Sequence, residues 1–201
     1  FTQSHDRKII MKLFFGCFAF IALLVTSPLH AKDWQSMKGS TLSFTSSFQG
    51  ESFTGEFKRF TPQIRFDPQN PAQGRFDVLI ELASADTRNT ERDDTLKTGE
   101  FFDVGKIATA KFTAVKFTAL AAGKFRADGF LTLRGITKPI ALVFNWQPGQ
   151  SGQPTILSGE AVVNRLDFRV GTGDWSDTGV LPNAVKVKTR LILAPKTVAK
   201  P

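Results

Sequence analysis

The chain has 201 residues, of which 26 are Lys or Arg and 18 are Asp or Glu, so its formal net charge is +8. The basic residues are spread along the chain and form no recognition helix or dense patch, which argues against nucleic-acid binding. The chain contains no Tyr, one Cys and two His, so few side chains are available for nucleophilic or metal chemistry.

The first predicted element is a secretory signal peptide. Met11 and a lysine precede an apolar run over residues 13–25, and the following short segment ends in the small residue Ala31. A positive start, a short apolar core and a small residue before the cut are typical of a cleaved signal. An uncleaved anchor is the alternative, although a membrane-spanning helix needs roughly 20 apolar residues. We therefore expect translation to start at Met11, residues 1–31 to be removed, and the mature chain to begin at Lys32.

Removal of this segment changes the chemistry that is available. His5, His30 and Cys17 are lost with it, so the remaining 170 of the 201 residues contain no His, Cys or Tyr. Ser-His-Asp and Cys-His catalysis are then excluded, as are zinc sites built on His or Cys. We expect no enzyme activity, no metal and no cofactor. Three basic residues and one acidic residue are removed, which leaves 23 and 17 and a net charge of +6. We interpret this charge as a solubilising surface, with attraction to anionic lipid headgroups as the alternative.

Three segments with apolar residues at every second position come next, and each predicts a β-strand. They cover residues 40–49, 53–66 and 76–83. The second segment is long and contains Gly55 and Pro62, which we interpret as a bend and as an edge position or bulge.

Residues 90–98 interrupt the strand pattern and predict one short helix. Thr90 followed by Asp93 fits an N-terminal capping pattern, and acidic residues in the first turn suit the helix dipole. Gly99 is expected to end the helix in the left-handed conformation. The aromatic pair Phe101 and Phe102 follows directly, so we expect this stretch to form a break in the β-structure beside an opening.

The acidic residues of this helix have a second interpretation. Glu91, Asp93 and Asp94 could form a carboxylate pair for glycoside hydrolysis or a calcium site. We interpret them as partners of the helix dipole. An Asp/Glu-dependent hydrolase is the enzyme alternative.

Five more alternating segments predict strands, and they cover residues 110–120, 124–134, 138–147, 156–168 and 184–193. Residues 171–182 form a loop with Trp175, and residues 195–201 are expected to be a disordered tail. Eight strands and one short helix predict an all-β fold, an eight-stranded antiparallel barrel that closes around a small ligand. A two-sheet sandwich that binds carbohydrate or protein at its surface is the alternative, and composition does not separate the two.

Several short motifs resemble, in order, the YceI-like family of bacterial periplasmic polyisoprenoid-binding proteins. They lie at residues 55–60 (GEFKRF), 64–68 (IRFDP), 92–104 (RDDTLKTGEFFDV), 129–139 (GFLTLRGITKP) and 167–171 (DFRVG). The resemblance implies one lipocalin-like barrel over residues 32–194 with a long apolar cavity. It also implies periplasmic binding of a polyprenyl chain, quinone tail or similar amphipathic lipid, without catalysis. The loop at residues 171–175 resembles a branch of the family encoded near membrane cytochromes of the b561 type, which implies transient contact with such a cytochrome. A homodimer is a further expectation of the resemblance.

The candidate ligand-binding residues come from the inward-facing pattern. The expected mature chain holds 15 Phe and 3 Trp, and Phe can line a dry cavity because it has no hydroxyl to satisfy. A solid core filled by the same rings is the alternative. The candidates for the cavity wall are Phe48, Phe57, Phe76, Val78, Ile80, Phe112, Leu131, Leu133 and Phe144. The candidates near the opening are Arg92, Phe101, Phe102, Trp146 and Trp175.

Overall fold

A computed structural model describes residues 1, 32–150 and 152–196 of the chain. The predicted signal peptide, which starts at Met11, and the predicted tail beyond residue 196 lie outside the described residues. No helix in the described part is long and apolar enough to span a membrane.

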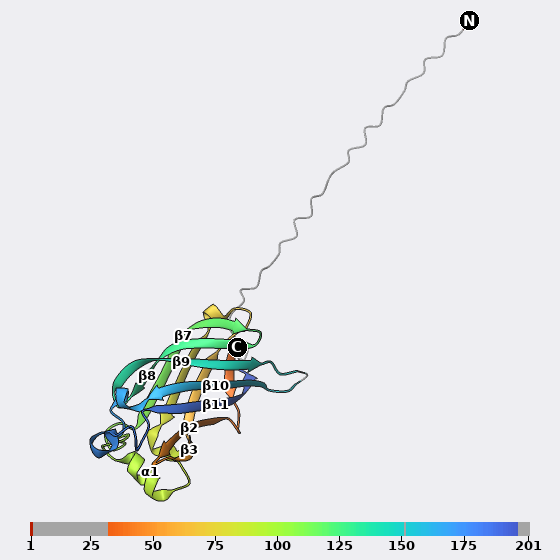
Figure 1. Cartoon of the computed structure of the whole chain (residues 1–201). Helices are drawn as coiled ribbons and strands as arrows, with labels where there is room; N and C mark the ends of the chain where they lie inside the picture. Colours follow the sequence, from red (N-terminus) through yellow and green to blue (C-terminus); the bar gives the residue numbers. More distant parts are fainter. Residues whose placement is uncertain (2–31, 151, 197–201) are drawn as a thin grey trace.

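The described chain forms one antiparallel sheet of eleven strands, seen as a tilted barrel in Figure 1. The strands are β1 (Asp33–Ser36), β2 (Thr41–Phe48), β3 (Glu51–Phe57), β4 (Phe60–Arg65), β5 (Arg75–Glu81), β6 (Ala85–Asp86), β7 (Thr109–Ala121), β8 (Lys124–Leu133), β9 (Ile136–Gln147), β10 (Thr155–Asn164) and β11 (Ala184–Pro195). The helices are α1 (Thr90–Lys97) and four 3-10 turns, η1 (Pro71–Gln73), η2 (Leu82–Ser84), η3 (Arg165–Phe168) and η4 (Gly173–Ser176).

Eight of these strands close a ring. The order around it is β1, β4, β5, β7, β8, β9, β10 and β11, and β11 pairs with β1 again. Strands β2, β3 and β6 continue the sheet from β11 at one end. The predicted eight-stranded antiparallel barrel is therefore confirmed, and closing the ring removes exposed strand edges from it.

The strand boundaries differ from the prediction at several points. The predicted strand over residues 156–168 ends at Asn164, where the η3 turn begins, and the predicted strand over residues 76–83 ends at Glu81, where the η2 turn begins. The predicted strand over residues 53–66 is two strands, β3 and β4, separated by Lys58 and Arg59. The Lys58 amide donates to the Ser84 carbonyl, and the Arg59 amide donates to Ser84 Oγ at 3.0 Å. The amides at this point thus donate to the η2 turn, while the Arg59 carbonyl accepts from the Glu81 amide at the end of β5 at 3.0 Å. The η2 turn also separates β5 from β6, and the short strands β1 and β6 are additions to the predicted set.

Helix α1 agrees with the predicted position to within one residue, but both of its ends are built differently. Asn89 caps the start, because its Oδ1 accepts a hydrogen bond from the Arg92 amide at 2.9 Å. The Asp93 carboxylate instead accepts from the Thr87 amide and hydroxyl at 2.8 and 2.7 Å. Gly99 does not adopt the left-handed conformation, and the residue with positive φ after the helix is Asp103.

The helix and the segment after it connect the extension of the sheet back to the ring. They join β6, which ends the extension and is not paired with β7, to β7 in the ring. Figure 1 shows α1 at one end of the barrel. We call this the loop end, and it comprises α1, residues 98–108 and residues 170–182.

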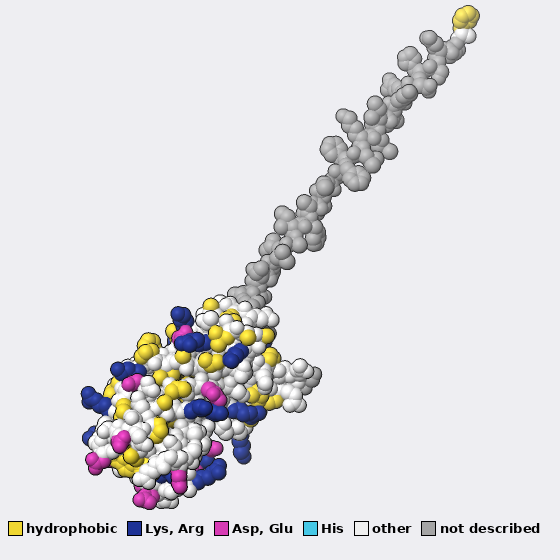
Figure 2. Space-filling model, in the orientation of Figure 1, with side chains coloured by type: hydrophobic (Ala, Val, Ile, Leu, Met, Phe, Trp, Pro, Cys, Tyr) yellow, Lys and Arg dark blue, Asp and Glu magenta, His cyan; other side chains and the backbone are white. Residues whose placement is uncertain are grey.

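The outer surface of the barrel carries mixed charge. Figure 2 shows Lys and Arg side chains interspersed with Asp and Glu over the visible face. One ion pair joins Lys188 Nζ and Glu160 Oε1 at 3.0 Å, and another joins Arg126 Nε and Asp128 Oδ1 at 2.7 Å. Exposed pairs of this kind contribute little to stability, about 0–1 kcal/mol each.

Candidate functional site: an apolar cavity in the barrel

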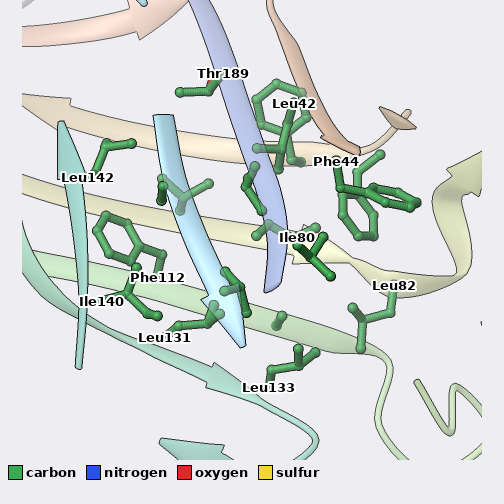
Figure 3. Close-up of a pocket in the computed structure, with 18 of the residues that line it drawn as sticks. Leu42, Phe44, Ile80, Leu82, Phe112, Leu131, Leu133, Ile140, Leu142 and Thr189 are labelled. Atoms are coloured by element: carbon green, nitrogen blue, oxygen red, sulfur yellow. The ribbon is translucent and has the colours of Figure 1, made fainter. Parts of the chain in front are cut away.

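A cavity of about 210 Å³ lies inside the barrel. Of the 31 residues that line it, only Ser46, Arg165 and Thr189 carry a polar side-chain group. The wall follows from strand geometry, since every second side chain of a strand points inward. Figure 3 shows Leu, Ile, Val and Phe side chains converging on the space from several strands. The interior is thus suited to hydrocarbon and poorly suited to water.

One end of the cavity is closed by packed rings, which we call the aromatic plug: Phe66, Phe76, Phe117, Phe125, Phe144 and Trp146. Phe66 is fully buried, and its ring centroid lies 5.0–6.0 Å from each of the other five. Of these six, only Phe76 also lines the cavity. Phe76 therefore forms part of the floor, and the other five rings fill the barrel behind it.

The loop end closes the cavity in a different way. Leu96 of α1 and the pair Phe101 and Phe102 line it from one side. Trp175 packs against the Phe101 ring at 5.2 Å between centroids and donates from Nε1 to a Glu100 carboxylate oxygen at 2.9 Å. This end is covered by side chains from loops and by one short helix, whereas continuous strands form the rest of the wall.

Arg165 holds the second loop of this end. It is only 3% exposed, and all five of its guanidinium hydrogens point to backbone carbonyls at 2.6–3.1 Å. These carbonyls belong to residues 170, 171, 175, 181 and 182, so one side chain ties the loop together. Burial lowers the pKa of the guanidinium, which nevertheless stays protonated. Arg165 also lines the cavity, and no ion pair found in the described residues involves it, so its positive charge is held by backbone carbonyls and not by a carboxylate.

The structure brings most of the predicted wall residues together. Seven of the nine line the cavity: Phe57, Phe76, Val78, Ile80, Phe112, Leu131 and Leu133. Phe144 and Phe48 do not line it. Phe144 is 1% exposed within the aromatic plug, and Phe48 lies at the end of β2 with its ring 5.8 Å from that of Trp175. Alternation identified the inward face of these strands, but it could not show where along a strand the cavity stops.

The residues predicted near the opening are divided between the two ends of the barrel. Phe101 and Phe102 line the cavity, and Trp175 packs against Phe101. Arg92 lies at the loop end with its guanidinium carbon 4.2 Å from the centroid of the Phe53 ring, a cation–π geometry. Trp146 belongs instead to the aromatic plug, where it is 3% exposed. Its predicted place near the opening needs correction, because β9 carries it toward the opposite end. Ligand contact by any of these residues stays a prediction.

Sequence reasoning missed several lining residues, among them Arg165. It follows Ala161 and Val163 at two-residue intervals, and all three line the cavity. An arginine in the inward-facing series of a strand was the available signal. Leu42, Phe44, Val185 and Val187 also line the cavity and were recognisable from the same alternation.

The acidic residues of α1 have structural partners. Asp93 accepts from Thr87, and Asp94 Oδ1 lies 2.9 Å from Lys97 Nζ. None of the three carboxylates lines the cavity. Within the described ranges, no group of three or more His, Cys, Asp or Glu side chains could hold a metal ion.

Comparison with known proteins agrees with this geometry. The family model for the YceI-like domain matches residues 35–193. A UPF0312 protein of Vibrio vulnificus is 31% identical over 179 residues, covering 83% of this chain and 95% of the relative. A UPF0312 protein of Pseudomonas fluorescens is 36% identical over 177 residues, covering 82% of this chain and 87% of the relative.

Solved structures give the same result for the fold. The crystal structure of BcnA from Burkholderia cenocepacia superposes with a TM-score of 0.72 and 28% identity, covering 77% of this chain and 96% of that one. A polyisoprenoid-binding domain from Saccharophagus degradans superposes with a TM-score of 0.64 and 20% identity, covering 83% and 100%. At that identity the second match supports the fold alone. Because the family model spans almost the whole described barrel, the chain belongs to the YceI-like family.

Proposed function

We propose that this protein binds a long isoprenoid-type lipid, such as a polyprenyl chain or a quinone tail, in its barrel and carries it without catalysis. The observation that carries the proposal is the cavity itself, in which 28 of the 31 lining residues are apolar. Membership of the YceI-like family supports it. The Saccharophagus degradans domain, whose fold this barrel shares, is named for polyisoprenoid binding, and we propose the same ligand class here.

The size of the cavity limits how much of the lipid it holds in this conformation. An engineered apolar cavity of about 150 Å³ binds benzene, so about 210 Å³ suits roughly ten carbon atoms. Burial contributes about 0.8 kcal/mol per methylene, or about 8 kcal/mol for ten carbons. This corresponds to roughly micromolar binding before the cost of association is subtracted. A longer chain then extends out of the loop end or widens the cavity.

The difference between the two ends of the barrel indicates the end at which a lipid would enter. The aromatic plug leaves no space behind Phe76, whereas the loop end is covered by α1 and side chains from loops. We therefore place the entry at the loop end, with the apolar tail toward Phe76 and the polar head toward Arg165. The periplasmic location, the transient contact with a b561-type cytochrome and the homodimer belong to the same proposal and rest on the sequence resemblance.

The surface-binding alternative has less support. It predicts that Trp146 and Trp175 are exposed, but Trp146 is buried in the plug and Trp175 is packed against Phe101 and hydrogen-bonded to Glu100. The hydrolase alternative requires carboxylates at the ligand, and no Asp or Glu lines the cavity.

Native mass spectrometry of the purified protein, with an organic extract analysed in parallel, tests the proposal. We expect an adduct that dissociates on activation and extracts as a prenyl or quinone compound. If the purified protein carries no bound lipid, it is then incubated with ubiquinone and with a polyprenol. Failure to bind either compound, in a protein shown to be folded by its circular dichroism spectrum, would overturn the proposal.

A further inference from the structure

One side chain that lines the cavity has a buried polar atom without a hydrogen-bond partner. Thr189 Oγ1 donates to the Thr41 carbonyl at 3.0 Å, and Arg165 donates all five of its hydrogens to carbonyls. Ser46 Oγ is buried and has no hydrogen-bond partner, and it is the one such side-chain atom in the part of the chain that the structure describes. Ser46 also lines the cavity.

The position of Ser46 in the sheet places it in the half of the cavity near the loop end. It follows Leu42 and Phe44 on the inward face of β2, and it pairs with Phe53 of β3. Two residues further along β2, the Phe48 ring packs against Trp175. Strand β11 pairs with β2 on one side and with β10 on the other, and Arg165 directly follows the last residue of β10.

An unpaired hydroxyl in an apolar wall lowers the stability of the folded protein. A buried hydroxyl that loses its water without gaining a partner is unfavourable, and an alanine in its place would avoid that cost. A ligand oxygen within reach of Ser46 Oγ would remove the cost on binding. Arg165 carries a positive charge at the same end of the cavity. In a medium of low dielectric constant this charge attracts an electron-rich ligand oxygen and disfavours a ligand group that donates a hydrogen bond.

We propose that Ser46 is a specificity-determining residue of the cavity, and that its hydroxyl donates a hydrogen bond to an acceptor oxygen in the ligand. The ligand class is thereby narrowed to apolar chains with a carbonyl, ether or ester oxygen near the head. This inference rests on the proposed function, because it assumes that an apolar chain enters the cavity. It extends that function by distinguishing oxygen-bearing chains from hydrocarbon of the same length.

The test compares two ligands of matched length in two variants. Decane and 2-decanone fit the estimated capacity of roughly ten carbon atoms. Their dissociation constants are measured by displacement of Nile red and corrected for partition from water. Ser46→Ala should raise the dissociation constant of 2-decanone by roughly five- to tenfold, the effect of losing one hydrogen bond. It should leave the dissociation constant of decane unchanged or slightly lower. The matched control is Thr189→Val, which removes a cavity hydroxyl that already has a partner and should change both constants by the same factor.

A spectroscopic measurement identifies the hydrogen bond itself. The carbonyl stretch of 2-decanone labelled with ¹³C should lie at a lower wavenumber in the native protein than in Ser46→Ala. Ser46→Cys, which keeps the shape but donates weakly, should give an intermediate position. The Cys variant also preserves the test if Ser46→Ala fails to fold.

The outcomes separate this inference from the proposed function. If Ser46→Ala lost affinity for both ligands equally, or lost affinity for neither, the role of Ser46 would be overturned while the proposed lipid cavity would stand. If the native protein binds neither decane nor 2-decanone and also refuses ubiquinone, the proposed function fails and this inference fails with it.

Discussion

The two ends of the barrel are built from similar strands and each contains a buried hydrophobic cluster, but their interiors are filled to different extents. At the aromatic end, six rings centred on Phe66 fill the interior, and hydrophobic contact supplies the stability. At the loop end, the interior is hollow, and hydrogen bonds from Arg165 hold the covering loop. A solid half can keep the sheet closed while the other half leaves space for a ligand. The barrel thus separates the residues that give stability from those that form the cavity.

The largest expected effect is loss of the central ring of the plug. Phe66→Ala should lower the free energy of unfolding by about 4 kcal/mol, because the surrounding rings cannot collapse into the cavity left behind. Phe57 offers a matched substitution, since it lines the existing cavity and is only half-buried. Phe57→Ala should cost about 2 kcal/mol. Urea denaturation measures both, and equal losses would contradict the division into a solid half and a hollow half.

The next effect is expected at the loop end. Arg165→Met keeps much of the side-chain volume but leaves five carbonyls without their donor, which should cost about 3 kcal/mol. The loss should be local, so limited proteolysis should cut first within residues 170–182. Arg126→Met on the outer surface is the control and should cost less than about 1 kcal/mol. Cleavage that begins instead in β7 or β8 would show that Arg165 supports the whole barrel.

The sequence predicted the features that leave a visible pattern of apolar residues, and it did not predict those that leave none. Alternation over residues 76–83 and 184–193 identified strands, because one face of each strand meets the apolar interior. The set of eight strands followed from that pattern, whereas the choice of a barrel over a sandwich was supported by the resemblance to the YceI-like family, and the position of α1 came from its capping and acidic residues. The strands β1 and β6 have four and two residues, which is too short for a period of two to be visible.

The missed features depend on partners that are distant in the sequence. The break at Lys58 and Arg59 arises because Ser84 bonds to their backbone. Trp146 was placed at the wrong end because alternation specifies the face of a strand and not the end of the barrel that a residue reaches. Arg165 could be recognised only by accepting that an arginine can face an apolar interior when carbonyls surround it.

A smaller effect on stability, but a large one on binding, is expected from filling the hollow half. Ala161 lines the cavity on β10, so Ala161→Phe should occupy part of the space that a ligand needs. We expect lipid affinity to fall at least tenfold, whereas the free energy of unfolding should change by about 1 kcal/mol in either direction. The neighbouring Val162 points outward and is 56% exposed, so Val162→Phe is the matched control and should leave affinity unchanged. Displacement of Nile red and urea denaturation measure the two quantities. Unaltered affinity in Ala161→Phe would place the ligand elsewhere.

The smallest effect concerns Asp77 on the outer face of β5, a strand that runs through both halves. Burial, the largest single influence, acts to raise the pKa of Asp77. Hydrogen bonds from Arg75 and Thr113, together with the positive charges of Arg75 and Lys111, outweigh burial and lower the pKa. A carboxyl with a lowered folded-state pKa contributes stability that is present above its unfolded pKa, about 3.9, and is lost as the pH falls through the folded-state value. Asp77→Asn should therefore cost up to about 1 kcal/mol at neutral pH, and the difference from the native protein should vanish in strong acid.

This last variant also tests whether the two halves unfold together. Trp34 and Trp146 lie close to one another near the aromatic end, and Trp175 lies at the loop end. In a protein that also carries Trp175→Phe, tryptophan fluorescence reports the aromatic end alone, while circular dichroism reports the whole sheet. Strand β5 contributes Phe76 to the plug and Ile80 to the hollow half. Asp77→Asn should therefore shift the unfolding midpoint by the same amount in both signals. A larger shift by circular dichroism would mean that the loop end unfolds first, and the barrel would then behave as two units of different stability.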